Sequence, residues 1–127
     1  MPNPNKDRGD RAERAVRDHL VEAGLPKVKK TRAGFDDDMG DIVVTDPADR
    51  HRRTILQVKD VASPQWSKWH DQVALQVEVA EAEHGVIVHK RRRSPGCTGQ
   101  VETWNVVMTL EQYTALLVRL GYRGPIS

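Results

Sequence analysis

The chain has 127 residues, one cysteine (Cys97) and a formal net charge of +2, from 20 Lys and Arg against 18 Asp and Glu. This length is typical of a single domain with one core, the lone cysteine excludes an internal disulfide, and the near balance of charge does not by itself indicate a nucleic-acid partner. Because no apolar stretch approaches the roughly 20 residues of a membrane helix and no signal peptide or lipidation motif opens the chain, the sequence predicts one domain over residues 1–127, in a reducing cytoplasm and without a membrane partner.

The N-terminal region is expected to begin with a disordered tail over residues 1–6, which hold two prolines and two asparagines. Apolar residues at helical spacing then predict a helix over about residues 7–23, ended by a glycine and a proline. Its apolar positions are Ala12, Ala15, Val16, Leu20 and Ala23. Glu13 borders this stripe, so it is either a ligand facing a site or an ordinary surface glutamate paired with Arg17.

Two apolar segments in the middle of the chain predict a pair of antiparallel strands. Residues 28–34 suit a short edge strand, and an acidic loop over 34–40 follows it. The first main strand is expected at 40–44 and the second at 54–59. The sequence Asp-Pro-Ala-Asp at 46–49 is a turn signal, which makes the two strands antiparallel neighbours.

The second of these strands carries polar residues on a face that a soluble strand normally buries. Side chains alternate along a strand, so Gln57 and Lys59 share one face, and the hairpin sets Asp41 beside them. Asp41 and the Gln57 carbonyl are oxygen ligands of the kind that Mg²⁺ prefers. Lys59 can orient or help deprotonate an attacking water and offset charge on a phosphate transition state. This arrangement indicates phosphodiester hydrolysis.

The second half of the chain predicts a helix, two strands and a terminal helix. Ser63 and Pro64 form a start signal for a helix to about His84. A strand over 85–89, a flexible loop over 94–100 and a strand over 101–108 follow. A capping box beginning at Thr109 starts the last helix, which runs to Leu120. The positions expected to face inward on the first of these helices are Trp66, Trp69, Val73, Gln76 or Val77, and Ala80.

Basic residues cluster in segments 27–32, 50–53 and 89–93, around an acidic run that leads to Asp41. Such basic segments around an acidic focus suit a phosphate backbone that approaches a metal centre, and any one run alone is explained equally well as a solvated loop. The candidate DNA contacts are Lys29, Lys30, Arg32, Lys90, Arg91, Arg92 and Arg93. Trp66 and Trp69 are expected to pack in the core or at a dimer contact rather than to stack on unpaired bases.

The pattern Asp41, fifteen residues, then Gln57-Val58-Lys59 resembles the motif of the PD-(D/E)xK nuclease superfamily. The segment Gly9–Arg14 looks like the first helix of archaeal-type Holliday-junction resolvases, in which a helical glutamate supplies a further acidic ligand. By that resemblance Glu13 joins Asp41 and Gln57 as a metal ligand. Gln72, on the helix after the motif strand, is then a candidate to reach the active site or DNA, with an ordinary surface amide as the alternative.

The resemblance implies an α/β fold with a restriction-endonuclease-like core, in which helices flank a central mixed β-sheet of four to five strands. It implies a Mg²⁺-dependent endonuclease, with Mn²⁺ as a substitute metal, that resolves four-way DNA junctions in recombination and repair. Because a junction is cut twice in matched positions, it also implies a homodimer.

The chain has Gln57 where the family usually has Glu or Asp, which removes one negative charge from the cation site. A nickase, repair or restriction-like nuclease of the same fold and a catalytically inactive DNA-binding module therefore stay open as alternatives. Zinc binding is discounted because the five histidines and the lone cysteine lack zinc-ligand spacing, and a Walker-type site because the sequence has no Gly-rich phosphate loop. A nucleophilic Cys97 is discounted because the sequence shows no activating neighbour.

Overall fold

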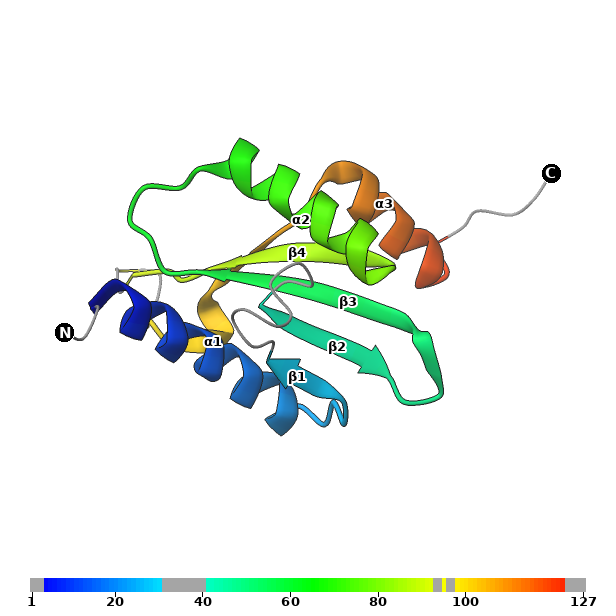
Figure 1. The fold of residues 1–127 in the computed structure, drawn as a ribbon, viewed down its shortest axis with the longest axis horizontal. Coiled ribbons are helices and arrows are strands. Elements are labelled where there is room, and N and C mark those ends of the chain that lie inside the picture. Colours follow the sequence, from blue (N-terminus) through cyan, green and yellow to red (C-terminus); the bar gives the residue numbers. More distant parts are fainter. Residues whose placement is uncertain (1–3, 31–40, 93–94, 96–97, 123–127) are drawn as a thin grey trace.

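The computed structural model describes residues 4–30, 41–92, 95 and 98–122. Within them, a five-stranded sheet has the strand order β1-β2-β3-β4-β5 (Figure 1). The strands are β1 (Val28–Lys30), β2 (Ile42–Asp46), β3 (Asp49–Lys59), β4 (His84–His89) and β5 (Asn105–Val107). Strands β3 and β4 are parallel and the other neighbouring pairs are antiparallel. The predicted α/β class with a mixed sheet is therefore confirmed.

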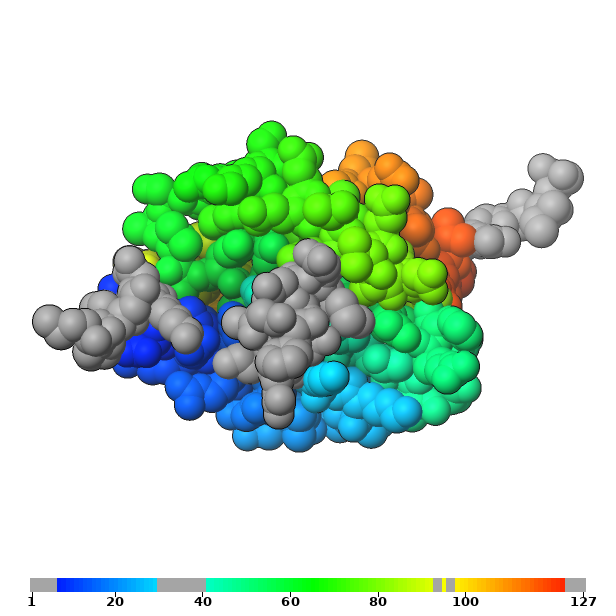
Figure 2. All heavy atoms as spheres, in the orientation of Figure 1, coloured from blue at the N-terminus to red at the C-terminus, as the bar shows by residue number. Residues whose placement is uncertain are grey.

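Helices cover both faces of the sheet. Helix α1 spans Pro4–Glu22, α2 spans Trp66–Ala80 and α3 spans Leu110–Arg119. Figure 1 shows α1 and α2 on opposite sides of the sheet, and in Figure 2 α1 and β1 form one side of the molecule and α2 the other. No helix in the described ranges is long and apolar enough to cross a membrane.

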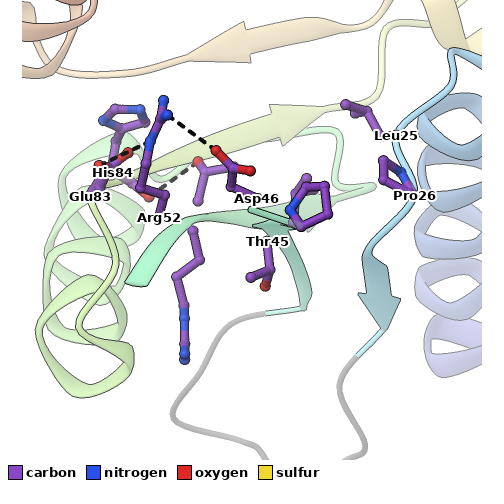
Figure 3. A pocket seen from close by; sticks show the side chains of 11 residues that line it. Leu25, Pro26, Thr45, Asp46, Arg52, Glu83 and His84 are labelled. Carbon is purple, nitrogen blue, oxygen red and sulfur yellow. Dashed lines mark hydrogen bonds and ion pairs between the residues drawn. The ribbon is translucent and has the colours of Figure 1, made fainter. Parts of the chain in front are cut away.

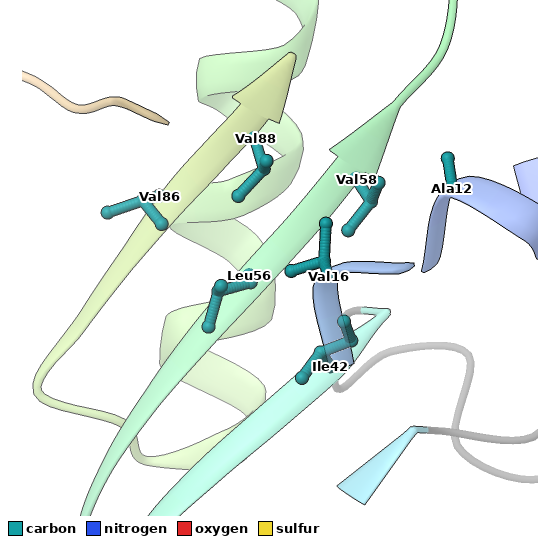
Figure 4. Packing of buried hydrophobic residues seen from close by; sticks show 7 residues of the cluster. All are labelled: Ala12, Val16, Ile42, Leu56, Val58, Val86 and Val88. Atoms are coloured by element: carbon teal, nitrogen blue, oxygen red, sulfur yellow. The ribbon is translucent and has the colours of Figure 1, made fainter. Parts of the chain in front are cut away.

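The two faces of the sheet carry separate parts of the core because strand side chains alternate. On the α1 face, Ala12 and Val16 of the helix pack on Leu56 and Val58 of β3 (Figure 4). Ile42, Val86 and Val88 complete that cluster. On the α2 face, the buried residues are Val43, Ile55, Trp69, Val73, Ala80 and Ile87. Leu56 and Val58 thus face α1, whereas Ile55 faces α2.

Two elements in the first half of the chain start earlier than predicted. Helix α1 begins at Pro4, so the predicted tail over 1–6 is wrong for its last three residues. Strand β3 begins at Asp49 rather than at residue 54. The turn is held by side chains, since Asp46 Oδ1 accepts from the Ala48 N–H and Asp49 Oδ1 from the His51 N–H. The tight turn sets Asp49 opposite Asp46, and after a shift in register Arg53 pairs with Thr45 of β2.

Helix α2 is shorter than the predicted segment from Ser63 to His84. Gln65 occupies its N-cap without a side-chain hydrogen bond, so the Ser63-Pro64 start signal is wrong. At the other end Glu81 takes a left-handed conformation with φ of 53°, and its N–H returns to the Glu78 carbonyl. This reversal ends the helix and allows β4 to begin at His84.

The predicted strand over 101–108 is wrong in its first half, where Val101–Thr103 form a 3₁₀ turn before β5. The turn is closed by the Thr103 hydroxyl, which donates to the Gln100 carbonyl at 2.6 Å. The predicted cap of α3 is confirmed, because Thr109 Oγ1 accepts from the Gln112 N–H. Predictions for the strand residues 31–34, the acidic loop 34–40 and positions 94, 96 and 97 of the 94–100 loop lie outside the described residues.

Candidate active site

Asp41, Gln57 and Lys59 lie near one end of the sheet, on the face toward α2. Strands β2 and β3 pair with Ile42 opposite Leu56 and Val43 opposite Ile55, so continuing the register by one residue sets Asp41 opposite Gln57. Ile55 packs on Ala80 of α2, and Gln57 and Lys59 follow it at strand spacing on the same face. The structure therefore brings together the three residues that the sequence grouped.

Asp41 is fixed by the backbone of the neighbouring strand. Its Oδ2 accepts a hydrogen bond of 2.8 Å from the Val58 N–H, in a partly buried position. A carboxylate bound in this way at the start of β2 cannot rotate freely, because turning away would leave a strand N–H unsatisfied. The strand pairing thus positions the first acidic group of the site.

Gln57 is the buried polar residue of the described core, with 4% of its surface exposed. Its Nε2 donates to Oε1 of Gln76 on α2 at 3.3 Å, which orients the amide. Its own Oε1 is buried and has no hydrogen-bond partner among the described residues. A buried acceptor without a donor costs roughly 1–3 kcal/mol, so this oxygen suits a cation or another donor that occupies the site.

Lys59 is half-buried, and its Nζ lies 5.4 Å from the centre of the Trp69 ring. Burial lowers the pKa of Lys59 from its usual value of 10.5. The charge of Asp41 opposes this shift in pKa, that of Lys68 adds to it, and that of Glu13 opposes it more weakly. Lys59 is therefore electrostatically coupled to both candidate carboxylates.

Glu13 lies in the other layer of the fold and acts on Lys59 through its charge. It is half-buried on α1, between the core residues Ala12 and Val16, and its charge acts on Lys59. Arg17, the alternative partner, forms an ion pair of 3.0 Å with Asp18. Helix α1 thus contributes a second carboxylate to the electrostatic environment of Lys59.

The donor set of this site fits a hard cation. Glu13 and Asp41 offer carboxylate oxygens, and the unpartnered Gln57 Oε1 offers a neutral oxygen of the type that Mg²⁺ accepts. No group of three or more His, Cys, Asp or Glu side chains is arranged as a metal site in the part of the chain that the structure describes. Any cation held here would therefore depend on Gln57 in addition to the two acids.

Helix α2 supplies two contacts that the sequence interpretation did not assign to the site, the Gln76 hydrogen bond to Gln57 and the Trp69 ring beside Lys59. Gln72 lies one turn before Gln76, and its Oε1 is also buried without a hydrogen-bond partner among the described residues. Helix α2 runs antiparallel to β3 (Figure 1). Gln72, one turn before Gln76, therefore lies further along β3, on the side toward Lys59. The spacing of Gln72 and Gln76 was the available signal for this polar face.

The candidate DNA contacts have different environments. Lys29 is exposed on β1 and Arg91 is half-buried after β4. Lys90 and Arg92 form ion pairs of 3.6 and 3.1 Å with Asp60, whose side chain is 1% exposed. The side chains of Lys30, Arg32 and Arg93 lie outside the described residues. Two of the described candidates therefore also hold a buried carboxylate.

The two tryptophans of α2 differ in exposure. Trp69 is buried, as expected for core packing, whereas Trp66 is 37% exposed and packs edge-on against Trp69 with ring centres 5.2 Å apart. His89 of β4 lies against both rings. The aromatic cluster covers the α2 side of the sheet next to Lys59.

A separate cavity of about 280 Å³ lies at the opposite end of β3 (Figure 3). Arg52 crosses it and pairs with Asp46 at 3.1 Å and with Glu83 at 3.7 Å. Glu83 also pairs with Arg119 of α3. Because these charges neutralise one another, the cavity is better explained as an ion-pair network that joins β2, β3 and α3 than as a reaction site.

Comparisons of the chain with protein-family models, with curated proteins and with solved structures give no match.

Proposed function

We propose that the chain is a Mg²⁺-dependent, structure-selective DNA endonuclease that acts on four-way junctions. The observation that carries the proposal is the buried Gln57 Oε1, which has no hydrogen-bond partner among the described residues and lies on β3 between Asp41 and Lys59. An acceptor kept in this position at a cost in stability is explained by a bound cation. Mn²⁺ is expected to substitute, because it takes the same oxygen ligands.

Asp41, Gln57 and Glu13 are the residues that would hold the metal, and when bound it would supply positive charge to the phosphate and lower the pKa of a water. Lys59 acts on the same phosphate or water. Its lowered pKa makes the neutral amine more accessible than in an ordinary lysine, which a proton acceptor needs. In its charged form it offsets negative charge that builds on the phosphate oxygens. Trp69 shields one side of the amine from solvent.

Resolving a four-way junction requires two matched cuts and therefore two copies of the site. The proposed function thus requires a symmetric homodimer. The second candidate function is a catalytically inactive DNA-binding module of the same fold. It is favoured by the neutral side chain of Gln57 and by the absence of a three-residue acid or histidine cluster among the described residues. The two functions differ in whether Mg²⁺ supports cutting.

The test is a cleavage assay with Mg²⁺ on three labelled substrates, a four-way junction, a linear duplex and a flap. We expect cutting of the junction, and a loss on the order of a hundredfold in rate for Asp41→Asn and Lys59→Ala. Asp71→Asn, on the exposed side of α2, is the matched control and should cut normally. Binding in Ca²⁺ should survive in all variants.

Cutting of the duplex or flap instead would indicate another nuclease of this fold. Binding of the junction without cutting would indicate the inactive module. Full cleavage activity in both Asp41→Asn and Lys59→Ala would contradict the proposed site.

A Mg²⁺ titration in the same assay addresses Gln57 directly. Gln57→Glu adds a negative charge to the cation site, so the Mg²⁺ concentration for half-maximal cutting should fall, whereas Gln57→Ala and Glu13→Gln should raise it. The exposed Gln100→Glu adds the same charge elsewhere and should leave the midpoint unchanged. If no midpoint moves, neither Gln57 nor Glu13 is a ligand.

A further inference from the structure

A second cavity, of about 370 Å³, lies on the face of the sheet opposite to Lys59. Its charged lining comes from Arg8 and Arg11 on α1, from Asp60 directly after β3 and from Lys90 directly after β4, and Trp104 closes one wall. This volume falls at the small end of ligand-binding pockets and exceeds what a phosphate group alone would fill. The cavity is large enough for a phosphate with an attached sugar.

The charge of this cavity is positive. Asp60 is the one carboxylate among the described residues of its lining, and Lys90 and Arg92 already pair with it. Arg8 and Arg11 are exposed and form no ion pair with another described residue. Two guanidinium groups one helical turn apart are thus left without an anion in the same concavity.

Asp60 does not cancel this positive charge. Its side chain is 1% exposed, and both carboxylate oxygens are held in ion pairs with Lys90 and Arg92. The carboxylate is therefore neutralised behind the cavity wall, and the exposed charge of the described lining comes from the arginines of α1.

We propose that this cavity is a phosphate site that takes the sugar-phosphate unit of a nucleotide. Arg8 and Arg11 bind the phosphate through their planar forks, for which guanidinium geometry is well suited. Lys90, which lies 5.6 Å from the centre of the Trp104 ring, balances the charge of Asp60, and the remaining volume of the cavity takes the sugar. The same chemistry is offered by a DNA strand and by a free nucleotide.

The cavity and the candidate active site lie back to back across the end of β3. Asp60 follows Lys59 and points to the other face, and the Lys90 N–H donates to the Lys59 carbonyl at 2.9 Å. Assigning the phosphate to a DNA strand rests on the proposed function. Phosphate binding itself does not rest on it, so it is measured without metal and without cleavage.

The experiment is a titration of the ¹⁵N-labelled full chain, in EDTA and at constant ionic strength, followed by amide and indole NMR signals. The probes are inorganic phosphate, thymidine 5′-monophosphate and the phosphodiester dinucleotide of thymidine. We expect saturable shifts around residues 8–12, 59–60 and 90 and at the Trp104 indole N–H, which is held by the Gly99 carbonyl. A probe with a sugar should bind more tightly than inorganic phosphate.

The decisive variant is Arg8→Ala with Arg11→Ala, and its matched control is Arg14→Ala with Arg17→Ala, which removes the same charge at the same spacing on α1 outside the cavity. The first double variant should weaken binding by at least about tenfold and the second by less than about twofold, because only the first removes charge-assisted hydrogen bonds.

Equal weakening by both variants, or shifts that do not saturate, would overturn the site. Preference for the monophosphate over the dinucleotide would assign it to a free nucleotide, and the reverse preference to a DNA strand. Failure of the cleavage assay would leave these results intact.

Discussion

Lys59 is kept in a partly buried position that makes its charge costly. Burial lowers the pKa of its ammonium, and the nearby carboxylates of Asp41 and Glu13 only oppose this shift. A residue chosen for stability alone would be apolar here, since the neighbouring surface is the Trp69 ring. The proposed catalytic role would explain why a charged residue is kept here at a cost in stability.

Replacing this lysine should stabilise the protein. Between the lowered pKa of the folded state and 10.5, the unfolded chain holds more protons, so the free energy of unfolding of the wild type rises with pH through that window. Below the window the full cost of the charge is present. We expect Lys59→Met to raise the free energy of unfolding at pH 7 and to remove the rise at alkaline pH, as measured by urea denaturation.

The exposed Lys27→Met is the control, because it loses the same group from a surface position between α1 and β1 and does not act on Lys59. Its effect should stay within about 0.5 kcal/mol of the wild type. If Lys59→Met is less stable than the wild type at pH 7, the attraction of Lys59 to Asp41 and Glu13 stabilises the fold by more free energy than burial of the charge costs.

At the scale of the elements, the contact between α2 and β4 depends on the absence of a side chain at Gly85. A Cβ there would lie 2.5 Å from Val73 Cγ1 and 2.7 Å from Val77 Cγ2. Val73 is buried against Trp69 and Ile87, so it has little room to move. Gly85 therefore sets how closely α2 approaches the sheet. Gln76 lies on the same turns of α2, so its position depends on this contact.

Gly85→Ala should cost about 1–3 kcal/mol of unfolding free energy through overpacking, and it should also lower cleavage, because it displaces the helix that orients Gln57. The matched control is Gly9→Ala in α1, where an added Cβ meets nothing within 4 Å. That change should stabilise the protein by about 0.4–1 kcal/mol. Thermal denaturation distinguishes the two, and a stabilised Gly85→Ala would mean that α2 adjusts without strain.

Local patterns predicted three features correctly, although the Ser63-Pro64 start signal of α2 was wrong. The alternation along β3, the turn after Asp46 and the Thr109 cap depend on neighbouring residues, and each is present as predicted. The end of α2 was missed because Glu81 adopts a left-handed conformation that its residue type does not signal.

The parts of the site that depend on packing between distant segments were not predictable. The Gln57–Gln76 hydrogen bond requires the register of α2 on β3, and the pairing of Asp60 with Lys90 and Arg92 joins residues about thirty positions apart. No alternation or capping pattern encodes such contacts, whereas the face shared by Gln57 and Lys59 follows from strand geometry alone.

At the scale of the whole molecule, the basic residues have two kinds of role. Lys29 is exposed on the edge strand β1 and forms no ion pair within the described ranges, whereas Arg92 is tied to the buried Asp60. If both contact DNA phosphates, only one of them can be removed without a structural effect. The effect of neutralising each residue on binding and on stability separates these roles.

Lys29→Ala should reduce the slope of log affinity against log salt concentration by about 0.9 for duplex and junction DNA alike, without a change in melting temperature. Arg92→Ala should lower the melting temperature as well, because among the described residues Asp60 then keeps Lys90 alone as an ion-pair partner. Fluorescence anisotropy at several salt concentrations measures the slopes. An unchanged slope for Lys29→Ala would identify that residue as a solvated surface charge.

The parallel pairing of β3 with β4 has a consequence for how the chain folds. Strands β2 and β3 meet through a turn of a few residues, but Thr54 and His84, which face each other across the parallel pair, are 30 residues apart. Closing that longer loop costs more chain entropy and is slower. We expect the hairpin with Asp41 and Gln57 to form first, and the polar face of α2 to reach it only in the last folding step.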